Sequence, residues 1–320
     1  MKRTLIGKLG IGLMAFSFAL LSFAKVSLAA ESSDPIKLAM NDWSSQLINS
    51  RIMGAVLEQA GYNVEYIQAD AAAQFVGLKR GDLHVQMEVW STAQAHLFKE
   101  GVESGKIDDL GETGMQGIEE WWYPSYMVER CPGLPDWKAL KACAEEFATP
   151  ETAPKGRYVG APVNWGGFDD ERVEALDLGF EVIHAGSDAA MFAELASAYE
   201  RKAPVIVWVW APHWVPSKFD GAWVDFPAYQ DACYEDPSWG INPDMAYDCG
   251  KPRGPIWKTS WSGLKDKWPG AFNALKNFST DNDEQSAMIA KVELEQIPIE
   301  DVVAEWMANN EDRWNSWLKN

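Results

Sequence analysis

Basic residues are scarce in this chain of 320 residues: 28 lysines and arginines stand against 47 aspartates and glutamates, a formal net charge of −19. A surface with this balance repels phosphate backbones, so nucleic acid is not an expected partner. Reactive motifs are also lacking, because none of the four histidines, His84, His96, His184 and His213, stands in an HExxH pattern and no GxSxG or CxxC occurs. With His213 as the only candidate base, we expect no enzyme and no cofactor for chemistry.

Long hydrophobic runs are absent after residue 30. Before it, a basic start is followed by an apolar run at 9–24 and a small-residue stretch at 27–30. This pattern is typical of a secretory signal peptide, cleaved near Ala29 or Ala30, and it predicts a periplasmic protein. An uncleaved membrane anchor is the alternative, but the apolar run is shorter than the roughly 20 residues that a spanning helix needs.

Cysteine is limited to four residues, Cys131, Cys143, Cys233 and Cys249. Export to an oxidising compartment allows disulfides to persist, and four cysteines permit three pairings. We favour the local pairing, 131 with 143 and 233 with 249, because each bond then closes a short loop. A zinc site is the alternative, but no histidine ligand lies nearby.

Strands alternate with helices along the chain. The predicted strands lie at 36–43, 63–69, 83–90, 156–165, 180–186 and 204–212, and the predicted helices at 44–61, 72–81, 169–179 and 188–202. This alternation predicts an α/β fold with parallel-rich sheets flanked by helices. The length favours two lobes, with a ligand cleft between them. We expect lobe I to comprise 31–121 plus 225–320 and lobe II to comprise 122–224, joined by crossing strands at 114–129 and 221–230. The tail, 299–320, is predicted to be one amphipathic helix.

The segment 228–255 interrupts this alternation, since it is rich in Pro, Gly, Asp and Asn and contains the second cysteine pair. We expect a disulfide-closed excursion, with a hairpin as the candidate geometry, attached to lobe I. Its oxygen side chains make a candidate structural Ca²⁺ site: Asp231, Asp236, Asn242, Asp244 and Asp248. The spacing matches no EF-hand, so a solvated acidic loop is the favoured interpretation.

Tryptophan is abundant, with 17 residues, and four of them end predicted strands: Trp43, Trp90, Trp165 and Trp210. Ligands of open α/β sheets bind beyond the carboxyl ends of the strands, so these rings are predicted to form a cage in the cleft. Indole faces attract cations without hydrogen bonds, which favours a small methylated ammonium ligand. A sugar is the alternative, but the polar residues that its hydroxyls need are sparse there. Trp208 and Trp214 are assigned to packing.

Three motifs carry a family resemblance: "NDW" at 41–43, "VNWGG" at 163–167 and "VWAPHWVPSKF" at 209–219. With them the chain resembles the periplasmic binding proteins of ABC importers for glycine betaine, proline betaine and choline. The resemblance implies a two-lobed type II periplasmic-binding fold, a cage at the same four tryptophans, and delivery of the ligand to an ABC permease in the inner membrane. We expect a monomer.

The identity of the ligand depends on the groups beside the cage. Gly166 offers a backbone N–H to a carboxylate or an oxide oxygen. Glu119, Glu120 and Trp122 lie on the first crossing, where a buried acid would oppose a betaine carboxylate and favour a hydroxyl or an N-oxide. Solvated hinge glutamates are the alternative. The acidic crossing and the excursion resemble the trimethylamine N-oxide-binding branch, which we favour, with glycine betaine or choline as alternatives and a secreted sensor as a different class.

Overall fold

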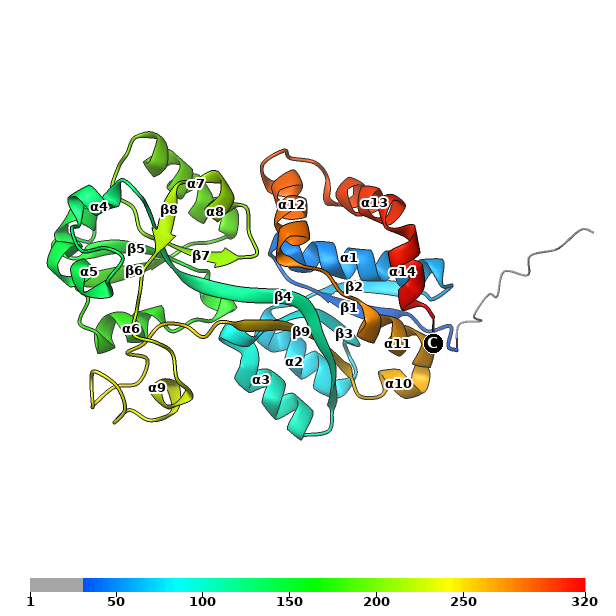
Figure 1. The fold of residues 1–320 in the computed structure, drawn as a ribbon. Coiled ribbons are helices and arrows are strands. Elements are labelled where there is room, and N and C mark those ends of the chain that lie inside the picture. Colours follow the sequence, from blue (N-terminus) through cyan, green and yellow to red (C-terminus); the bar gives the residue numbers. More distant parts are fainter. Residues whose placement is uncertain (1–30, 320) are drawn as a thin grey trace, which may run out of the picture.

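The computed structural model describes residues 31–319, so the predicted signal peptide lies outside the described residues. Two halves lie side by side in Figure 1, and the long strand β4 (Ile107–Pro124) runs through both. We call the half built on β1 lobe I and the half built on β5 lobe II. Across 31–319, no helix combines the length and the hydrophobicity needed to cross a membrane.

Lobe I is a mixed sheet in the order β2-β1-β3-β9-β4. Strand β1 pairs in parallel with β2 and β3, whereas β9 is antiparallel to β3 and to the first part of β4. The strands besides β4 are β1 (Ile36–Met40), β2 (Val64–Gln68), β3 (Val85–Trp90) and β9 (Gly254–Trp261). The helices are α1 (Ser44–Gln59), α2 (Ala71–Arg80), α3 (Ser91–Glu103), α10 (Leu264–Lys267), α11 (Pro269–Asn277), α12 (Asn282–Glu293), α13 (Ile299–Asn309) and α14 (Glu311–Trp317).

Lobe II continues the sheet from the second part of β4 in the order β4-β7-β5-β6, with β8 on β4. Strand β5 is parallel to β6 and β7, and β4 is antiparallel to β7 and β8. The strands are β5 (Gly156–Gly160), β6 (Phe180–His184), β7 (Val207–Ala211) and β8 (Gly221–Trp223). The helices are α4 (Met127–Arg130), α5 (Trp137–Cys143), α6 (Asp169–Ala175), α7 (Asp188–Glu200), α8 (Val215–Lys218), α9 (Asp231–Glu235) and the short 3-10 turns η1 (Ala144–Phe147) and η2 (Val163–Trp165).

Local sequence explains most of these elements. Every residue of β3 is buried, as expected for a central strand that helices cover on both faces. Helix α2 ends at Gly81, whose φ of +74° is the left-handed conformation that glycine adopts without a steric penalty. The predicted α/β alternation is confirmed, with parallel pairs around β1 and β5 and antiparallel pairs wherever β4 or β9 takes part.

The second crossing differs from the prediction at 221–230. Strand β8 pairs with the Trp122–Pro124 end of β4 and stays in lobe II. The chain instead returns to lobe I at the start of β9, where Gly254 pairs with Gly117 of β4. Packing β8 onto the free edge of β4 satisfies its backbone groups, which a strand crossing alone between lobes would not achieve.

The tail forms two helices rather than one. Helices α13 and α14 are separated at Asn310, and this break brings the Trp317 ring within 5.7 Å of the Trp306 ring in a stacked pair. In one continuous helix, residues 306 and 317 would lie about three turns apart along the axis, too far for their rings to stack. Ring stacking against the lobe I core therefore outweighs the helical period of the segment.

Both predicted disulfides are present, Cys131–Cys143 and Cys233–Cys249. The second closes the excursion 228–255, which contains the short helix α9 and otherwise irregular chain. Two of its contacts are with lobe II: Tyr247 stacks on Phe168 at 4.2 Å, and the Asn242 side chain donates to the Ala175 carbonyl. The bounds of the lobes stay a prediction, and these contacts favour placing the excursion with lobe II.

Candidate functional site

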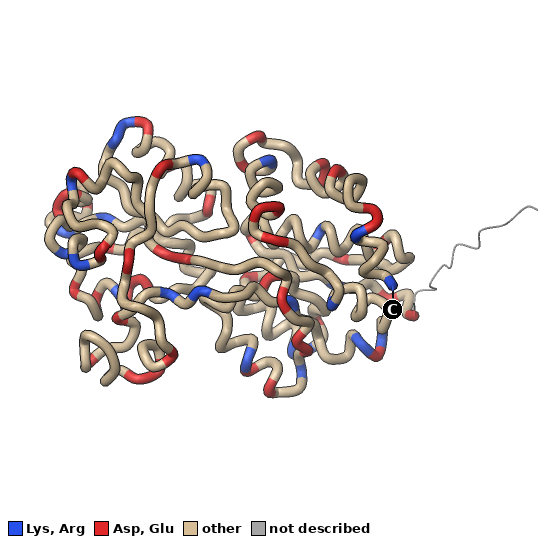
Figure 2. Tube along the Cα trace, viewed as in Figure 1, with Lys and Arg blue, Asp and Glu red and all other residues tan. Residues whose placement is uncertain are grey.

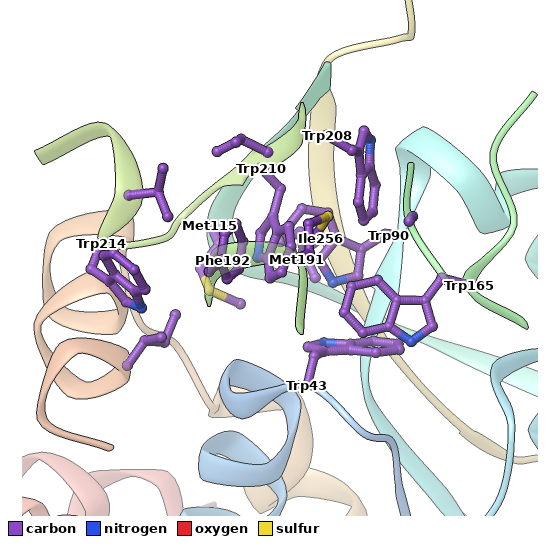
Figure 3. Close-up of a cluster of buried hydrophobic side chains, with 14 of the residues drawn as sticks. Trp43, Trp90, Met115, Trp165, Met191, Phe192, Trp208, Trp210, Trp214 and Ile256 are labelled. Atoms are coloured by element: carbon purple, nitrogen blue, oxygen red, sulfur yellow. The ribbon is translucent and has the colours of Figure 1, made fainter. Parts of the chain in front are cut away.

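A pocket lies where the two lobes meet, and indole rings form most of its wall (Figure 3). We call it the tryptophan pocket. It encloses about 310 Å³ including its open mouth, and its lining is Trp43, Trp90, Ala93, Gln94, Glu119, Trp165, Trp208 and Trp210. The structure therefore brings together the four tryptophans predicted to form a cage, and Glu119 with them.

The pocket walls come from both lobes. Trp90 is the last residue of β3, and Trp43 lies between β1 and α1. From lobe II, Trp210 lies near the end of β7, whereas Trp165 sits in the turn η2, beyond the end of β5. The carboxyl ends of these strands all point toward the cleft, which is why residues far apart in the chain meet there. Trp165 spans the junction, because its ring centre lies 5.4 Å from that of Trp43 and 5.4 Å from that of Trp210.

Trp208 has a different place from the one that the sequence suggested. It was assigned to strand packing, but its ring lines the tryptophan pocket, 5.3 Å from Trp210 and 5.7 Å from Trp165. Side chains two residues apart on a strand share a face, so the period of β7 already pairs Trp208 with Trp210. Trp214 lies outside this lining, near α12 in Figure 3, and its indole N–H donates to Glu293 at 2.5 Å.

Glu119 is the one ionisable side chain among the described residues that line the tryptophan pocket. It lies opposite Trp210 in the β4–β7 ladder and is 7% exposed. Burial raises the pKa of Glu119, and the Lys251 ammonium and the Thr92 hydroxyl only partly oppose that shift. A carboxyl group that stays protonated to a higher pH than usual therefore faces the pocket, and a neutral carboxyl can donate a hydrogen bond as well as accept one.

The other three predicted ligand residues do not line the pocket. Glu120 pairs with the Arg172 guanidinium at 2.5 Å and accepts the backbone N–H of Lys251. Trp122 is buried against Gly221 of β8, where an added Cβ would come within 2.0 Å of its ring. The N–H of Gly166 donates to the Val163 carbonyl within its own turn. A ligand role for these three residues stays a prediction without support from their placement.

Charge at the crossing is distributed unevenly. Figure 2 shows acidic residues on the part of β4 that joins the lobes and basic residues on the neighbouring segment that leads into β9. Within that segment, the Lys251 ammonium binds the Asp169 carboxylate at 3.1 Å and lies 5.4 Å from the centre of the Trp208 ring. The nearest basic group is thus paired with an acid behind the pocket wall, which leaves Glu119 without a cation of its own.

Behind the lobe I wall lies Glu88, which the sequence analysis did not consider. Its carboxylate accepts hydrogen bonds from the indole N–H of Trp43 at 2.9 Å and of Trp90 at 3.1 Å. It also accepts from the Ser45 hydroxyl and the Asn49 amide. The signal was present in the sequence, since Glu88 and Trp90 are two residues apart on β3 and share a face.

Two acids of lobe I, Asp42 and Glu293, make contacts with lobe II beside the tryptophan pocket. Asp42 of lobe I accepts the indole N–H of Trp165 at 2.7 Å. Glu293 of α12 accepts from Trp214 and lies 3.3 Å from Nε2 of His213. Burial lowers the pKa of His213, while Glu293 opposes this shift. The only histidine considered as a base is thus a buried residue between the lobes.

The calcium prediction finds no support in the excursion, because its oxygen groups are used in local turns. Asp248 accepts the backbone N–H groups of Ile241 and Asn242. The remaining side chains act separately: Asp231 accepts from the Tyr229 hydroxyl, Asp236 from Ser238, and the Asn242 oxygen from the Asp244 N–H. Between residues 31 and 319, no group of three or more His, Cys, Asp or Glu side chains is arranged to hold a metal ion.

Comparison with known proteins relates the chain to one family. The family model described as the substrate-binding domain of ABC-type glycine betaine transport systems matches residues 34–309. A trimethylamine N-oxide-binding protein of Pelagibacter ubique (strain HTCC1062) is 34% identical over 317 residues, which cover 95% of this chain and 97% of that protein.

Solved structures share the fold at low sequence identity. The glycine betaine/L-proline-binding protein ProX of Borrelia burgdorferi has a TM-score of 0.70 at 19% identity and covers 90% of this chain and 97% of its own. An ABC-transporter choline-binding protein in complex with choline has a TM-score of 0.70 at 18% identity and covers 90% and 92%. Both likenesses establish the two-lobed binding-protein fold.

Proposed function

The chain belongs to the family of substrate-binding domains of ABC-type glycine betaine transport systems, and we propose that its own ligand is trimethylamine N-oxide, held in the tryptophan pocket. Membership makes it a transport binding protein rather than an enzyme. The observation that carries the proposed ligand is a carboxyl group, Glu119, set among five indole rings at the junction of the lobes.

The indole rings account for binding of the methylated nitrogen. Each desolvated ring face attracts a cationic centre by about 0.5–2 kcal/mol, and the methyl groups gain from leaving water. Three or four such contacts reach about 8 kcal/mol, which corresponds to a micromolar Kd. A methylated nitrogen has no N–H groups, so it needs no hydrogen-bond acceptor among the rings.

Glu119 selects the other end of the ligand. In its neutral form this carboxyl donates a hydrogen bond to an N-oxide oxygen, whereas in its ionised form it repels the carboxylate of glycine betaine. No lysine or arginine is among the described residues of the pocket lining, so a betaine carboxylate would lack a charged partner. Choline is the second candidate, because its hydroxyl can donate to the ionised form. The name of the 34% identical relative also supports trimethylamine N-oxide.

We further propose that the protein works in the periplasm as a monomer, after cleavage of residues 1–30 near Ala29 or Ala30, and delivers the ligand to an inner-membrane ABC permease. Proteins of this family act outside the cytoplasm. Capture would draw the lobes together, since ligand contacts with both lobes favour the closed state. The bonds from Asp42 and Glu293 across the junction would then hold that state.

Calorimetry with trimethylamine N-oxide tests the proposal. We expect Trp165→Ala to weaken binding at least tenfold, because its ring touches walls from both lobes. Trp137→Ala, at the start of α5 and away from the pocket, is the matched control and should bind like the wild type. Unchanged affinity in Trp165→Ala, or wild-type binding of a sugar in preference to any methylated amine, would contradict the proposed function.

A further inference from the structure

Glu88 is a buried acid without a basic partner in its hydrogen bonds. It is fully buried, yet the four groups that donate to it are all neutral: two indoles, a hydroxyl and an amide. Burying a carboxylate is costly unless its oxygens are hydrogen-bonded, and four donors meet that need. A residue that serves only to fill this space would be apolar, since an apolar side chain carries no desolvation penalty.

The four donors stabilise the ionised form. One oxygen accepts from Trp43, Trp90 and Ser45, and the other accepts from Asn49. Indole N–H groups donate and cannot accept, so a proton on the first oxygen would displace an indole bond. Burial raises the pKa of Glu88, and the four hydrogen bonds act against that shift. The network therefore stabilises a negative charge behind the rings of Trp43 and Trp90.

The charge of Glu88 reaches the ligand through the rings. A carboxylate that accepts an indole N–H polarises the indole and draws its charge distribution toward a more negative face. It also places a full negative charge directly behind the wall, in an interior where electrostatic interactions are weakly screened. Both effects favour a cationic centre over an uncharged group of the same shape, and the two rings concerned, Trp43 and Trp90, both line the pocket.

We propose that Glu88 determines the preference of the tryptophan pocket for a positively charged nitrogen: its buried carboxylate fixes the rings of Trp43 and Trp90 through their N–H groups and makes their faces more attractive to a cation. Glu88 is a positioning residue, since it acts through the indoles. The inference rests on the proposed function only in taking this pocket as the ligand site.

The test compares charged ligands with their uncharged isosteres. Trimethylamine N-oxide and choline are titrated beside tert-butanol and 3,3-dimethyl-1-butanol, in which carbon replaces the charged nitrogen, with ligand-observed NMR for the weak pairs. We expect Glu88→Gln to weaken binding of the charged members at least tenfold and of the isosteres less than threefold. Glu65→Gln is the matched control, because it removes an exposed carboxylate of lobe I on β2, away from the pocket lining; we expect it to lose less than threefold for every ligand.

The outcomes separate this inference from the proposed function. A wild-type protein that binds neither charged ligand would overturn the proposed function. Equal losses for charged and uncharged ligands in Glu88→Gln would show a purely structural role and overturn the inference, as would full retention of affinity. Should Glu88→Gln fail to fold, Glu119→Gln serves as a background in which position 119 no longer titrates. There, acidification should shift the indole N–H resonances of Trp43 and Trp90 and weaken binding over one pH range; separate pH ranges would overturn the inference.

Discussion

The two halves of the tryptophan pocket are held in place by different means. In lobe I, Trp43 and Trp90 are tied to one buried carboxylate, Glu88, within their own lobe. In lobe II, Trp165, Trp208 and Trp210 pack on one another at 5.3–5.7 Å, and the indole N–H of Trp165 is bonded to the opposite lobe. The hydrogen bonds of the lobe I wall therefore need only lobe I, whereas the hydrogen bond of Trp165 needs both lobes in contact.

This difference predicts separate roles for the two lobes during binding. A preorganised wall lowers the entropic cost of the first encounter, so lobe I is the expected surface for initial capture. Lobe II then supplies the remaining rings on closure, and Glu119, on the strand shared by both lobes, meets the polar end of the ligand. Substitutions on the shared strand, at the junction and within lobe I test this difference.

The largest effect is expected at Glu119, the group common to both halves. Its raised pKa means that the neutral donor form is lost as pH rises through that value, so wild-type affinity for trimethylamine N-oxide should fall from pH 5 to pH 8. Glu119→Gln keeps a donor but does not titrate, so we expect the fall in affinity toward pH 8 to disappear, with about a tenfold shift toward glycine betaine at pH 8, roughly 1.4 kcal/mol.

Calorimetry across this pH range checks the prediction for Glu119. Glu112→Gln, an exposed position on the same strand β4, is the matched control and should leave the pH profile unchanged. A pH profile that stays the same in Glu119→Gln would place the selective group elsewhere in the pocket.

A smaller effect is expected at Asp42, which joins the halves. Asp42→Ala removes the acceptor of the Trp165 indole N–H, a bond made across the lobes and partly open to solvent. We expect about a fivefold loss of affinity, near 1 kcal/mol, expressed as faster ligand release. Stopped-flow fluorescence measures the rate, with Asp82→Ala in lobe I as the control. An unchanged release rate would mean that ring packing alone holds lobe II in place.

The smallest effect concerns stability in lobe I. Burial lowers the pKa of His84 to about 4, and its Nδ1 accepts the Lys37 backbone N–H, so the folded state holds the neutral ring. The unfolded chain binds a proton more readily, so stability is present above about pH 6.5 and falls as pH drops toward 4.

We expect His84→Gln to reduce this acid-induced fall by about 1 kcal/mol, or roughly 2–4 °C in Tm. Thermal melts from pH 7 to pH 4.5 measure it, with His96→Gln, on the exposed face of α3, as the control. Identical acid sensitivity in wild type and His84→Gln would assign the pH dependence to lobe II, where His213 is also buried with a lowered pKa.

Local patterns predicted the parts of the site that depend on strand ends. Trp43, Trp90 and Trp210 follow or end strands, so the rule for parallel sheets was enough to bring them together. Trp165 lines the same pocket, but it lies in the turn η2, whereas the prediction placed it at the end of a strand. The two-residue period of their strands pointed to Trp208 and Glu88 as well, but Trp208 had a simpler interpretation as a packing residue, and Glu88 carried no signal beyond that period.

Composition and local sequence by themselves determined the α/β alternation, the two short-range disulfides and a set of tryptophans suited to a methylated ammonium. These follow from backbone periodicity, chain proximity and the chemistry of single side chains. Only the tertiary structure decided that Glu119 rather than Glu120 faces the pocket, that the excursion packs beside α6, and that one buried carboxylate holds two indoles. Those outcomes depend on which residues distant in sequence share a low-dielectric interior, and that is set by how the lobes pack.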